Sequence, residues 1–480
     1  MAEILKEEGL TYNDVLIVPK RSSILTRKDV STETRLSRNI KLASPVISAN
    51  MDTVTESEMA IAMARLGGIG IIHRFLTVAE EVAEVLRVKR LEAFSIDNPY
   101  TLEPNITLGE ARIKMAEWGV SGVLLVDGSR LLLGILTARD VLFETDLSKK
   151  ISELATPRAR LITAPQGVAL DIAKEILHKN KIEKLPLVDS IGRLVGLITS
   201  KDIKKIQEDS GATKDERGRF RVGAAVGVKN DEERTDALVA AGADVIVIDI
   251  AHGHSELVIA ELKRIKNKYP RIDVIAGNVA TAEATKDLIL AGADAIKVGV
   301  GPGAFCTTRV VAGVGFPQLS AVLNCALAAK GSGVPIIADG GVQYPGDVAK
   351  AMAAGASTVM VGALLAGTDE SPGVTLLRNG RKYKISRGMA SFGANMGRRA
   401  KENPRDNSAV MDYIPEGVEA MVPYRGTAAE VVRELLGGLR SGMSYCNARN
   451  IGELWERATF VRMTPAGLRE SLPHDVEVIE

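Results

Sequence analysis

A short apolar run rich in β-branched residues, closed by Gly, Asp or Asn and followed by a helical pattern, recurs along this chain of 480 residues. Intervening segments such as DEERTDALVAAGA are amphipathic and end in Gly-Ala, as helices do. The runs are PVISAN from Pro45, IGIIH from Ile69, VGAAVG from Val222, VIVID from Val245, DVIAGN from Asp273, AIKVG from Ala295, PIIADGG from Pro335 and TVMVG from Thr358. Because strands that alternate with helices form parallel sheets, eight such units predict an α/β fold, a (β/α)8 or TIM barrel.

A long interval interrupts this pattern between its second and third strands. About 150 residues separate IGIIH from VGAAVG, far more than one crossover helix needs. The interval contains a repeat, in which GVLLVDGSRLLLGILTARDV from Gly122 matches KLPLVDSIGRLVGLITSKDI from Lys184. Each copy predicts a buried strand, a turn, a second strand and a helix that begins at Thr-x-Arg/Lys-Asp. We therefore expect an inserted domain over residues 94–205, with residues 1–93 and 206–480 forming the barrel.

The two copies resemble cystathionine-β-synthase (CBS) motifs. In that family two motifs pair into a Bateman domain and often bind adenine or guanine nucleotides, with the Thr and Asp near the ribose and phosphate. The resemblance implies either a ligand site for ATP or GTP or a purely structural pair, and both interpretations stay open.

The ends of the predicted barrel strands carry polar residues and glycines. In a TIM barrel the chemistry lies on the loops that follow the carboxyl ends of the strands. Asp249, Asn278, Gly299, Asp339 and Gly362 all follow such strands. We expect them on one catalytic rim.

The segment GVGPGAFCTTR, from Gly299 to Arg309, follows the sixth strand directly. A lone cysteine such as Cys306 often packs as a small hydrophobe, and composition alone favours that interpretation. Its neighbours favour a nucleophile, because a thiolate needs nearby cations or backbone donors, and Arg309 and two hydroxyl residues follow it. Glycine turns on the same rim offer N–H groups to a phosphate. The site suits a nucleotide with an electrophilic carbon in its base.

The charge balance limits the partners of the chain. Lys and Arg number 61 against 60 Asp and Glu, so no overall field attracts nucleic acid or an anionic membrane. The cysteines Cys306, Cys325 and Cys446 form no CxxC pair, and the histidines lack zinc spacing with them, so neither disulfides nor a transition-metal site is expected. The sequence shows no signal peptide and no apolar run of membrane-spanning length. We expect a cytoplasmic protein.

Many specific motifs from Leu10 to Val476 resemble the inosine monophosphate (IMP) dehydrogenase/guanosine monophosphate (GMP) reductase family. They are MDTVTE, GAAVGV, VIDIAHGHS, AGNVAT, GVGPGAFCTTR, IADGG, GLRSGMSY and AGLRES. The resemblance implies that Cys306 attacks carbon 2 of a purine nucleotide and forms a thioimidate, while Thr308 and Glu416 relay protons. It also implies a homotetramer, which a CBS pair can stack into an octamer.

The resemblance assigns further residues to three sites. The nucleotide site comprises Asp339, at the ribose, with Gly340, Gly341, Gly362, Ala363, Gly388, Met389, Ala390 and Gly417. The nicotinamide side comprises Asp249, Ile250, Ala251, Asn278, Gly299 and Val300, with Arg74 either at a cofactor phosphate or only a solvated charge. A potassium loop comprises Gly301, Gly303 and Cys306, completed by Glu470 and Ser471 of a neighbouring subunit.

The segment from Gly388 to Gly417 is expected to distinguish a dehydrogenase from a reductase. In the dehydrogenases an Arg-Tyr pair before Pro-Glu-Gly activates water, but here Pro404-Arg405 occupies roughly that place and Tyr413 lies too close to Glu416. Asn50, FPQLSAV and GMASFGAN also resemble reductases, which favours a GMP reductase using NADPH. EGVEAMVPYRG and AGLRESLPHDV resemble dehydrogenases, so an IMP dehydrogenase using NAD is the alternative.

Three further expectations concern neighbouring features. Ala304 replaces a serine and Ser386 a tyrosine usual near the phosphate, which suggests that the phosphate relies on backbone donors. The polar run RRAKENPRDN from Arg398 suits a mobile flap or a plain surface loop. A nucleotide-sensing regulator without catalysis is the alternative from another class, and the presence of Cys306, Thr308 and Glu416 argues against it.

Overall fold

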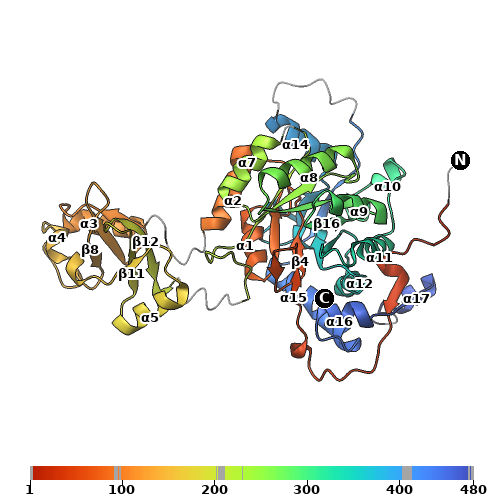
Figure 1. Ribbon diagram of the computed structural model, residues 1–480, viewed down its shortest axis with the longest axis horizontal. Coiled ribbons are helices and arrows are strands. Elements are labelled where there is room, and N and C mark those ends of the chain that lie inside the picture. Colours follow the sequence, from red (N-terminus) through yellow and green to blue (C-terminus); the bar gives the residue numbers. More distant parts are fainter. Residues whose placement is uncertain are drawn as a thin grey trace. The chain divides into compact units, whose positions relative to one another are not determined.

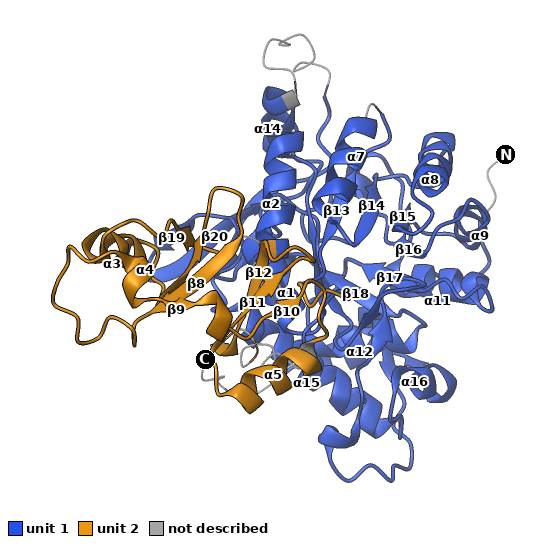
Figure 2. Ribbon diagram, turned by 60° about the vertical axis from the view of Figure 1, so that its left-hand side comes forward, with its two compact units in different colours: residues 1–89, 211–215, 220–480 blue, residues 90–210, 216–219 orange. Residues whose placement is uncertain are grey.

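The computed structural model describes residues 4–90, 96, 99–201, 203, 211–229, 231–402, 413–473 and 476. The chain divides into two compact units. Unit 1 comprises residues 1–89, 211–215 and 220–480, and unit 2 comprises residues 90–210 and 216–219 (Figure 2). The chain thus leaves unit 1 after residue 89 for one long segment, returns for residues 211–215, and leaves again only for residues 216–219.

Eight parallel strands of unit 1 close into a barrel. In barrel order they are β13 (Gly223–Val226), β14 (Val245–Asp249), β15 (Asp273–Val279), β16 (Ala295–Val298), β17 (Ile336–Asp339), β18 (Thr358–Val361), β4 (Val46–Ser48) and β5 (Ile69–Ile72). All eight strands predicted from the sequence are present, and the predicted (β/α)8 barrel is confirmed.

Helices alternate with these strands and surround them (Figure 1). They include α1 (Ser57–Arg65), α2 (Val78–Arg90), α7 (Glu232–Ala241), α8 (Glu256–Lys268), α9 (Ala282–Leu290), α11 (Gln318–Ala329), α12 (Pro345–Ala353), α13 (Ala363–Ala366) and α15 (Ala428–Tyr445). Helix α7 ends at Gly242 with a φ of 92°, as the Gly-Ala signal predicts.

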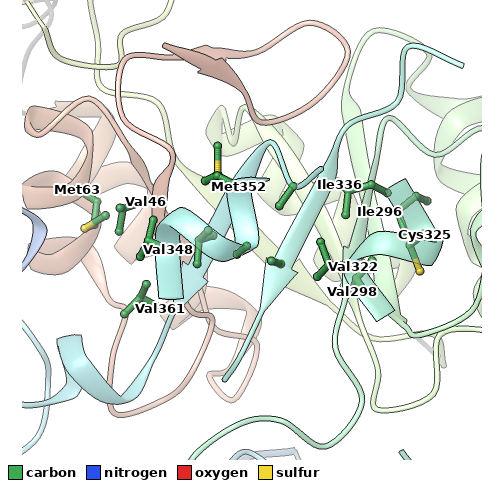
Figure 3. Packing of buried hydrophobic residues seen from close by; sticks show 14 of the residues in the cluster. Val46, Met63, Ile296, Val298, Val322, Cys325, Ile336, Val348, Met352 and Val361 are labelled. Atoms are coloured by element: carbon green, nitrogen blue, oxygen red, sulfur yellow. The ribbon is translucent and has the colours of Figure 1, made fainter. Parts of the chain in front are cut away.

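The alternation of side chains along each strand builds two apolar layers. On β14, Val245 and Val247 point into the barrel, and Ile246 and Ile248 pack outward against helices. Figure 3 shows the outer layer, in which Val322 and Cys325 of α11 lie beside β16. A hairpin of β2 (Thr34–Arg35) and β3 (Lys41–Leu42) closes the amino end of the barrel, so the functional end is the opposite one.

Unit 2 contains the internal repeat. In the first copy β7 (Gly122–Val126) pairs with β8 (Leu132–Thr137), and in the second β11 (Lys184–Val188) pairs with β12 (Leu194–Thr199). Both antiparallel pairs shift register at the same place, after Leu125 and after Leu187. The repeated sequence therefore produces repeated structure.

The helix predicted after the first copy is wrong. Residues 138–143 form turns, although Asp140 accepts hydrogen bonds from the Thr137 backbone N–H and hydroxyl, both at 2.7 Å, as the acidic residue of a capping box does. The segment buries little apolar surface that would stabilise a helix, since Leu142 and Phe143 are 66% and 90% exposed.

Two small sheets and several helices complete unit 1. Strands β19 (Thr375–Arg378), β20 (Arg381–Arg387) and β21 (Glu419–Pro423) form an antiparallel sheet. Helix α14 (Phe392–Glu402) follows β20, so the start of the run RRAKENPRDN is helical rather than a loop, and its residues 403–407 lie outside the described part. Within the described ranges, no helix has the length and apolar character that crossing a membrane requires.

Candidate active site

A cavity of about 280 Å³ opens at the carboxyl ends of the barrel strands. The loop after β16 supplies its longest stretch of wall, and the segments at Gly388 and Glu416 also line it. Of the residues predicted from the sequence, those lining this cavity are Asp249, Ile250, Ala251, Asn278, Gly299, Val300, Gly301, Gly303, Cys306, Thr308, Asp339, Gly340, Gly341, Gly362, Ala363, Gly388, Met389, Ala390 and Glu416. The barrel thus gathers segments more than 100 residues apart into one site.

The Cys306 thiol lies in the cavity wall beside a hydroxyl group. Its Sγ is 3.2 Å from the Oγ1 of Thr308, the first residue of the short helix α10 (Thr308–Val311). The thiol is half-buried and free of any disulfide. A partly accessible sulfur beside a hydroxyl can exchange its proton and attack a carbon in the cavity.

Backbone pairing joins the segment that carries Glu416 to the loop that carries Cys306. Thr307 N–H donates to the Glu416 carbonyl oxygen at 2.8 Å, and Val418 N–H donates to the Phe305 carbonyl oxygen at 2.9 Å. Gly417 pairs with Cys306 in this bridge, which places it behind the cavity wall rather than in it.

The loops after β16 and β17 approach each other too closely for side chains. Gly299 has a φ of 156°, and a Cβ there would lie 2.0 Å from the Asp339 carbonyl oxygen. Gly340 has a φ of 91°, and its Cβ would lie 3.1 Å from the Gly303 nitrogen. Glycine is therefore required for this close packing of backbone on backbone.

Arg309 does not act as the sequence suggested. Its guanidinium donates to the carbonyl oxygens of Val300 and Phe316 and does not line the cavity. The Arg309 side chain therefore holds the backbone of the cysteine loop and does not place its charge in the cavity.

Lys297, which the sequence analysis did not single out, lies at the base of the cavity with 2% of its surface exposed. Its ammonium is 2.9 Å from Asp249 Oδ1 and 2.9 Å from Asp339 Oδ2, and also donates to Asn278 Oδ1. Burial alone would lower the pKa of Lys297, but these two carboxylates raise it above its ordinary value. The only signal was a charged residue inside the otherwise apolar run AIKVG.

The same ammonium acts on Asp249. Burial favours the neutral acid, yet the charge of Lys297 outweighs it and holds the pKa of Asp249 below its ordinary value. Asp249 therefore stays ionised at neutral pH.

Ala304, Gly341 and Ala363 line the cavity and carry no side-chain hydroxyl. Ser386 does not line the cavity: it is fully buried, and its Oγ lies 2.8 Å from Thr53 Oγ1. None of the hydrogen bonds described for the chain uses the backbone N–H groups of Gly341 and Ala363, so both are available to an anion.

Four predicted residues lie outside the cavity wall. Gly417 lies in the bridge already described, and Arg74 stacks over the Phe75 ring at 5.2 Å. Glu470 and Ser471 lie at the end of α17 (Pro465–Glu470), away from the cavity lining of their own chain.

The segment expected to carry the water-activating pair is partly described. Pro404-Arg405 lies outside the described residues. The Tyr413 hydroxyl donates to the carbonyl oxygen of Ala390, a residue of the cavity wall, at 2.8 Å and so ties the two segments together.

Comparisons with known proteins agree on one family. Residues 9–474 match the model of the IMP dehydrogenase / GMP reductase domain. An inosine-5'-monophosphate dehydrogenase of Aquifex aeolicus is 54% identical over 100% of this chain and 98% of its own, and that of Nitrosopumilus maritimus is 52% identical over 98% and 99%. A GMP reductase of Leishmania donovani is 50% identical over 98% and 97%.

A solved structure is similar along the whole chain. The GMP reductase of Trypanosoma brucei in complex with guanosine 5'-monophosphate superposes with a TM-score of 0.89, at 48% identity over 98% of both chains. The barrel, the cysteine loop and these matches together show that the chain belongs to the IMP dehydrogenase / GMP reductase family, a family of purine nucleotide oxidoreductases.

Proposed function

We propose that this protein is a GMP reductase, which converts GMP to IMP and ammonia with NADPH. The observation that carries the proposal is the sequence between Gly388 and Gly417, which contains no Arg-Tyr dipeptide to activate water. Tyr413, the tyrosine of that interval, uses its hydroxyl to bind Ala390. Without an activated water, a thioimidate on Cys306 has hydride transfer as its route forward.

In the first step the Cys306 sulfur bonds to carbon 2 of GMP. The thiol proton passes to Thr308 at 3.2 Å and toward Glu416, which returns a proton to the departing amine. The bond between carbon 2 and the exocyclic nitrogen breaks, and ammonia leaves. The product of this step is a thioimidate.

In the second step a hydride replaces the sulfur at carbon 2. The residues from Asp249 to Ala251, with Asn278, line the same cavity as Cys306 and suit a nicotinamide group, which supplies the hydride when NADPH is bound. Cys306 leaves as the thiolate and recovers its proton. Two electrons reach the base, which becomes the hypoxanthine of IMP.

The remaining assignments support this chemistry. Asp339 holds the ribose, and the N–H groups of Gly341 and Ala363 bind the phosphate. The carbonyls of Gly301, Gly303 and Cys306 suit potassium, since the Gly303 oxygen accepts one bond from the Cys306 N–H at 3.0 Å and keeps a second lone pair. Glu470 and Ser471 complete this loop from a neighbouring subunit of a homotetramer.

Unit 2 is proposed as the CBS pair. Its two copies share strand pairing and register shift, as expected for a pseudo-symmetric module. ATP and GTP are the ligands to test there.

IMP dehydrogenase with NAD is the second candidate. The relatives from A. aeolicus and N. maritimus, at 54% and 52% identity, carry that name. This function requires a base other than an Arg-Tyr pair to activate water.

Absorbance at about 340 nm separates these functions, because the reduced nicotinamide absorbs there. Purified protein with potassium is supplied with GMP and NADPH, or with IMP and NAD. Loss of NADPH with release of ammonia establishes the reductase. NADH formed from IMP establishes the dehydrogenase, and binding of nucleotides without either signal points to a regulator.

A further inference from the structure

Lys297 is the one lysine or arginine among the described residues that line the cavity. It projects from β16, between β15 and β17 of the barrel. Its three ammonium protons have three acceptors, which are Asp249 Oδ1, Asn278 Oδ1 and Asp339 Oδ2. An ammonium has three donors, so this set is complete and leaves no proton for a ligand.

The acceptors belong to two different sides of the cavity. Asp339 is the proposed ribose ligand, and Asp249 lies on the proposed nicotinamide side. Asn278 reinforces the link, because its Nδ2 donates to Asp339 Oδ2 at 2.8 Å and to the Gly299 carbonyl oxygen at 2.8 Å. Asp339 Oδ2 thus receives two donors, while its Oδ1 accepts no hydrogen bond in the described part of the chain.

We infer that Lys297 is a positioning residue shared by the nucleotide and cofactor sites. Lys297 binds Asp339 Oδ2 and so leaves Oδ1 to face the ribose. Because the same ammonium also binds Asp249, the orientations of the two carboxylates depend on each other. The inference rests on the proposed function for the placing of the two ligands, and it adds that one buried ammonium couples them.

The Lys297 ammonium lies between two negative charges, which would interact unfavourably without it. Asp249 and Asp339 would repel each other across a buried space without a cation, and one would take up a proton. Arg74 lies near enough to Asp249 to favour its charge, and buried Tyr12 faces Asp339. The other titratable groups in the cavity wall are Cys306 and Glu416. With Lys297 present, Asp249 stays ionised at neutral pH.

The test measures binding of GMP and of IMP by calorimetry without cofactor, between about pH 7 and 8, above the second pKa of the nucleotide's own phosphate at about 6. In the native protein the dissociation constants stay flat with pH. In Lys297→Met they rise roughly 10-fold to 100-fold and depend on pH, because binding is linked to a proton on the carboxylate pair. Lys297→Arg keeps the charge, so its binding weakens but stays flat.

Lys89→Met is the matched control. Lys89 is also buried, with 4% exposed, and bridges Asp215 at 3.2 Å and Asp244 at 2.5 Å away from the cavity. This variant loses stability, but its binding of GMP and IMP and its pH profile stay native.

If Lys297→Met does not fold, the single variant Asp249→Asn is compared with the double variant Asp249→Asn/Lys297→Met. The inference predicts weaker nucleotide binding in the double variant, because Asp339 has lost its ammonium. Equal binding in the two, or a native and pH-flat affinity in folded Lys297→Met, would overturn it. A native protein that binds neither GMP nor IMP instead refutes the proposed function.

Discussion

The backbone N–H of Thr307 donates a 2.8 Å hydrogen bond to the carbonyl oxygen of Glu416. This bond joins the loop after β16 to the segment before β21, more than 100 residues further along the chain. Cys306, the proposed nucleophile, and Glu416, its proposed proton partner, are therefore linked through a backbone bridge, and each side chain can be removed separately.

Cys306→Ala is expected to reduce turnover by more than about 10⁴-fold while GMP still binds, because the covalent step is lost and the pocket is kept. Initial rates and calorimetry measure the two effects. Cys325→Ala is the control, since that thiol is fully buried in the outer core and burial raises its pKa to about 11. Comparable turnover in Cys306→Ala and the native protein would exclude the covalent mechanism.

Glu416→Gln is expected to lower kcat by roughly 10²-fold to 10³-fold, because the amide keeps the shape of the side chain but cannot accept a proton. Initial rates at saturating GMP and NADPH measure this loss. Glu419→Gln, on the nearby strand β21, is the control: Glu419 Oε1 accepts the Gly393 N–H, which an amide oxygen also does. A native rate in Glu416→Gln would assign the proton transfer to another group.

Gly299→Ala is expected to destabilise the barrel by more than about 3 kcal/mol, because the added Cβ would lie 2.0 Å from the Asp339 carbonyl oxygen. Gly313→Ala is the matched control, with a φ of 67° and no atom within 4 Å of its Cβ, so it costs only about 1 kcal/mol of backbone strain. Thermal and urea unfolding measure both. Equal losses would show that the close approach of the two loops is not needed.

Acid is expected to remove the stability that Asp249 contributes. Burial opposes its charge, but Lys297 prevails and lowers its folded pKa below the unfolded value, so the contribution is fully present above about pH 4 and is lost as pH falls through the folded pKa. Urea unfolding of the native protein and Asp249→Asn should therefore differ near neutral pH and converge near about pH 2. A difference that stays constant with pH would mean that the pKa of Asp249 is the same in the folded and the unfolded protein.

Local patterns were sufficient to predict the eight barrel strands and the placing of Asp249, Asn278, Gly299, Asp339 and Gly362 on one rim. The reason is that an apolar run followed by a helical pattern predicts where a strand ends, and the loop to the next helix begins at that end. Two local predictions were wrong or incomplete. Asp140 closes a turn where a helix was expected, and residues 398–402 are helical in α14.

The tertiary structure decided which residues of neighbouring strands contact one another. Asp249 aligns with Gly277, Gly277 with Lys297 and Lys297 with Ile337, so the register of four parallel strands brings Lys297 to two carboxylates 48 and 42 residues away. The tertiary structure also directs the Arg309 side chain to the carbonyl oxygen of Val300, in the same loop, and not into the cavity. The sequence by itself determined the kind of barrel and the end that carries the chemistry, because both follow from local periodicity. Which charges meet in the cavity depends on barrel closure and register, because no local pattern encodes a distance between strands.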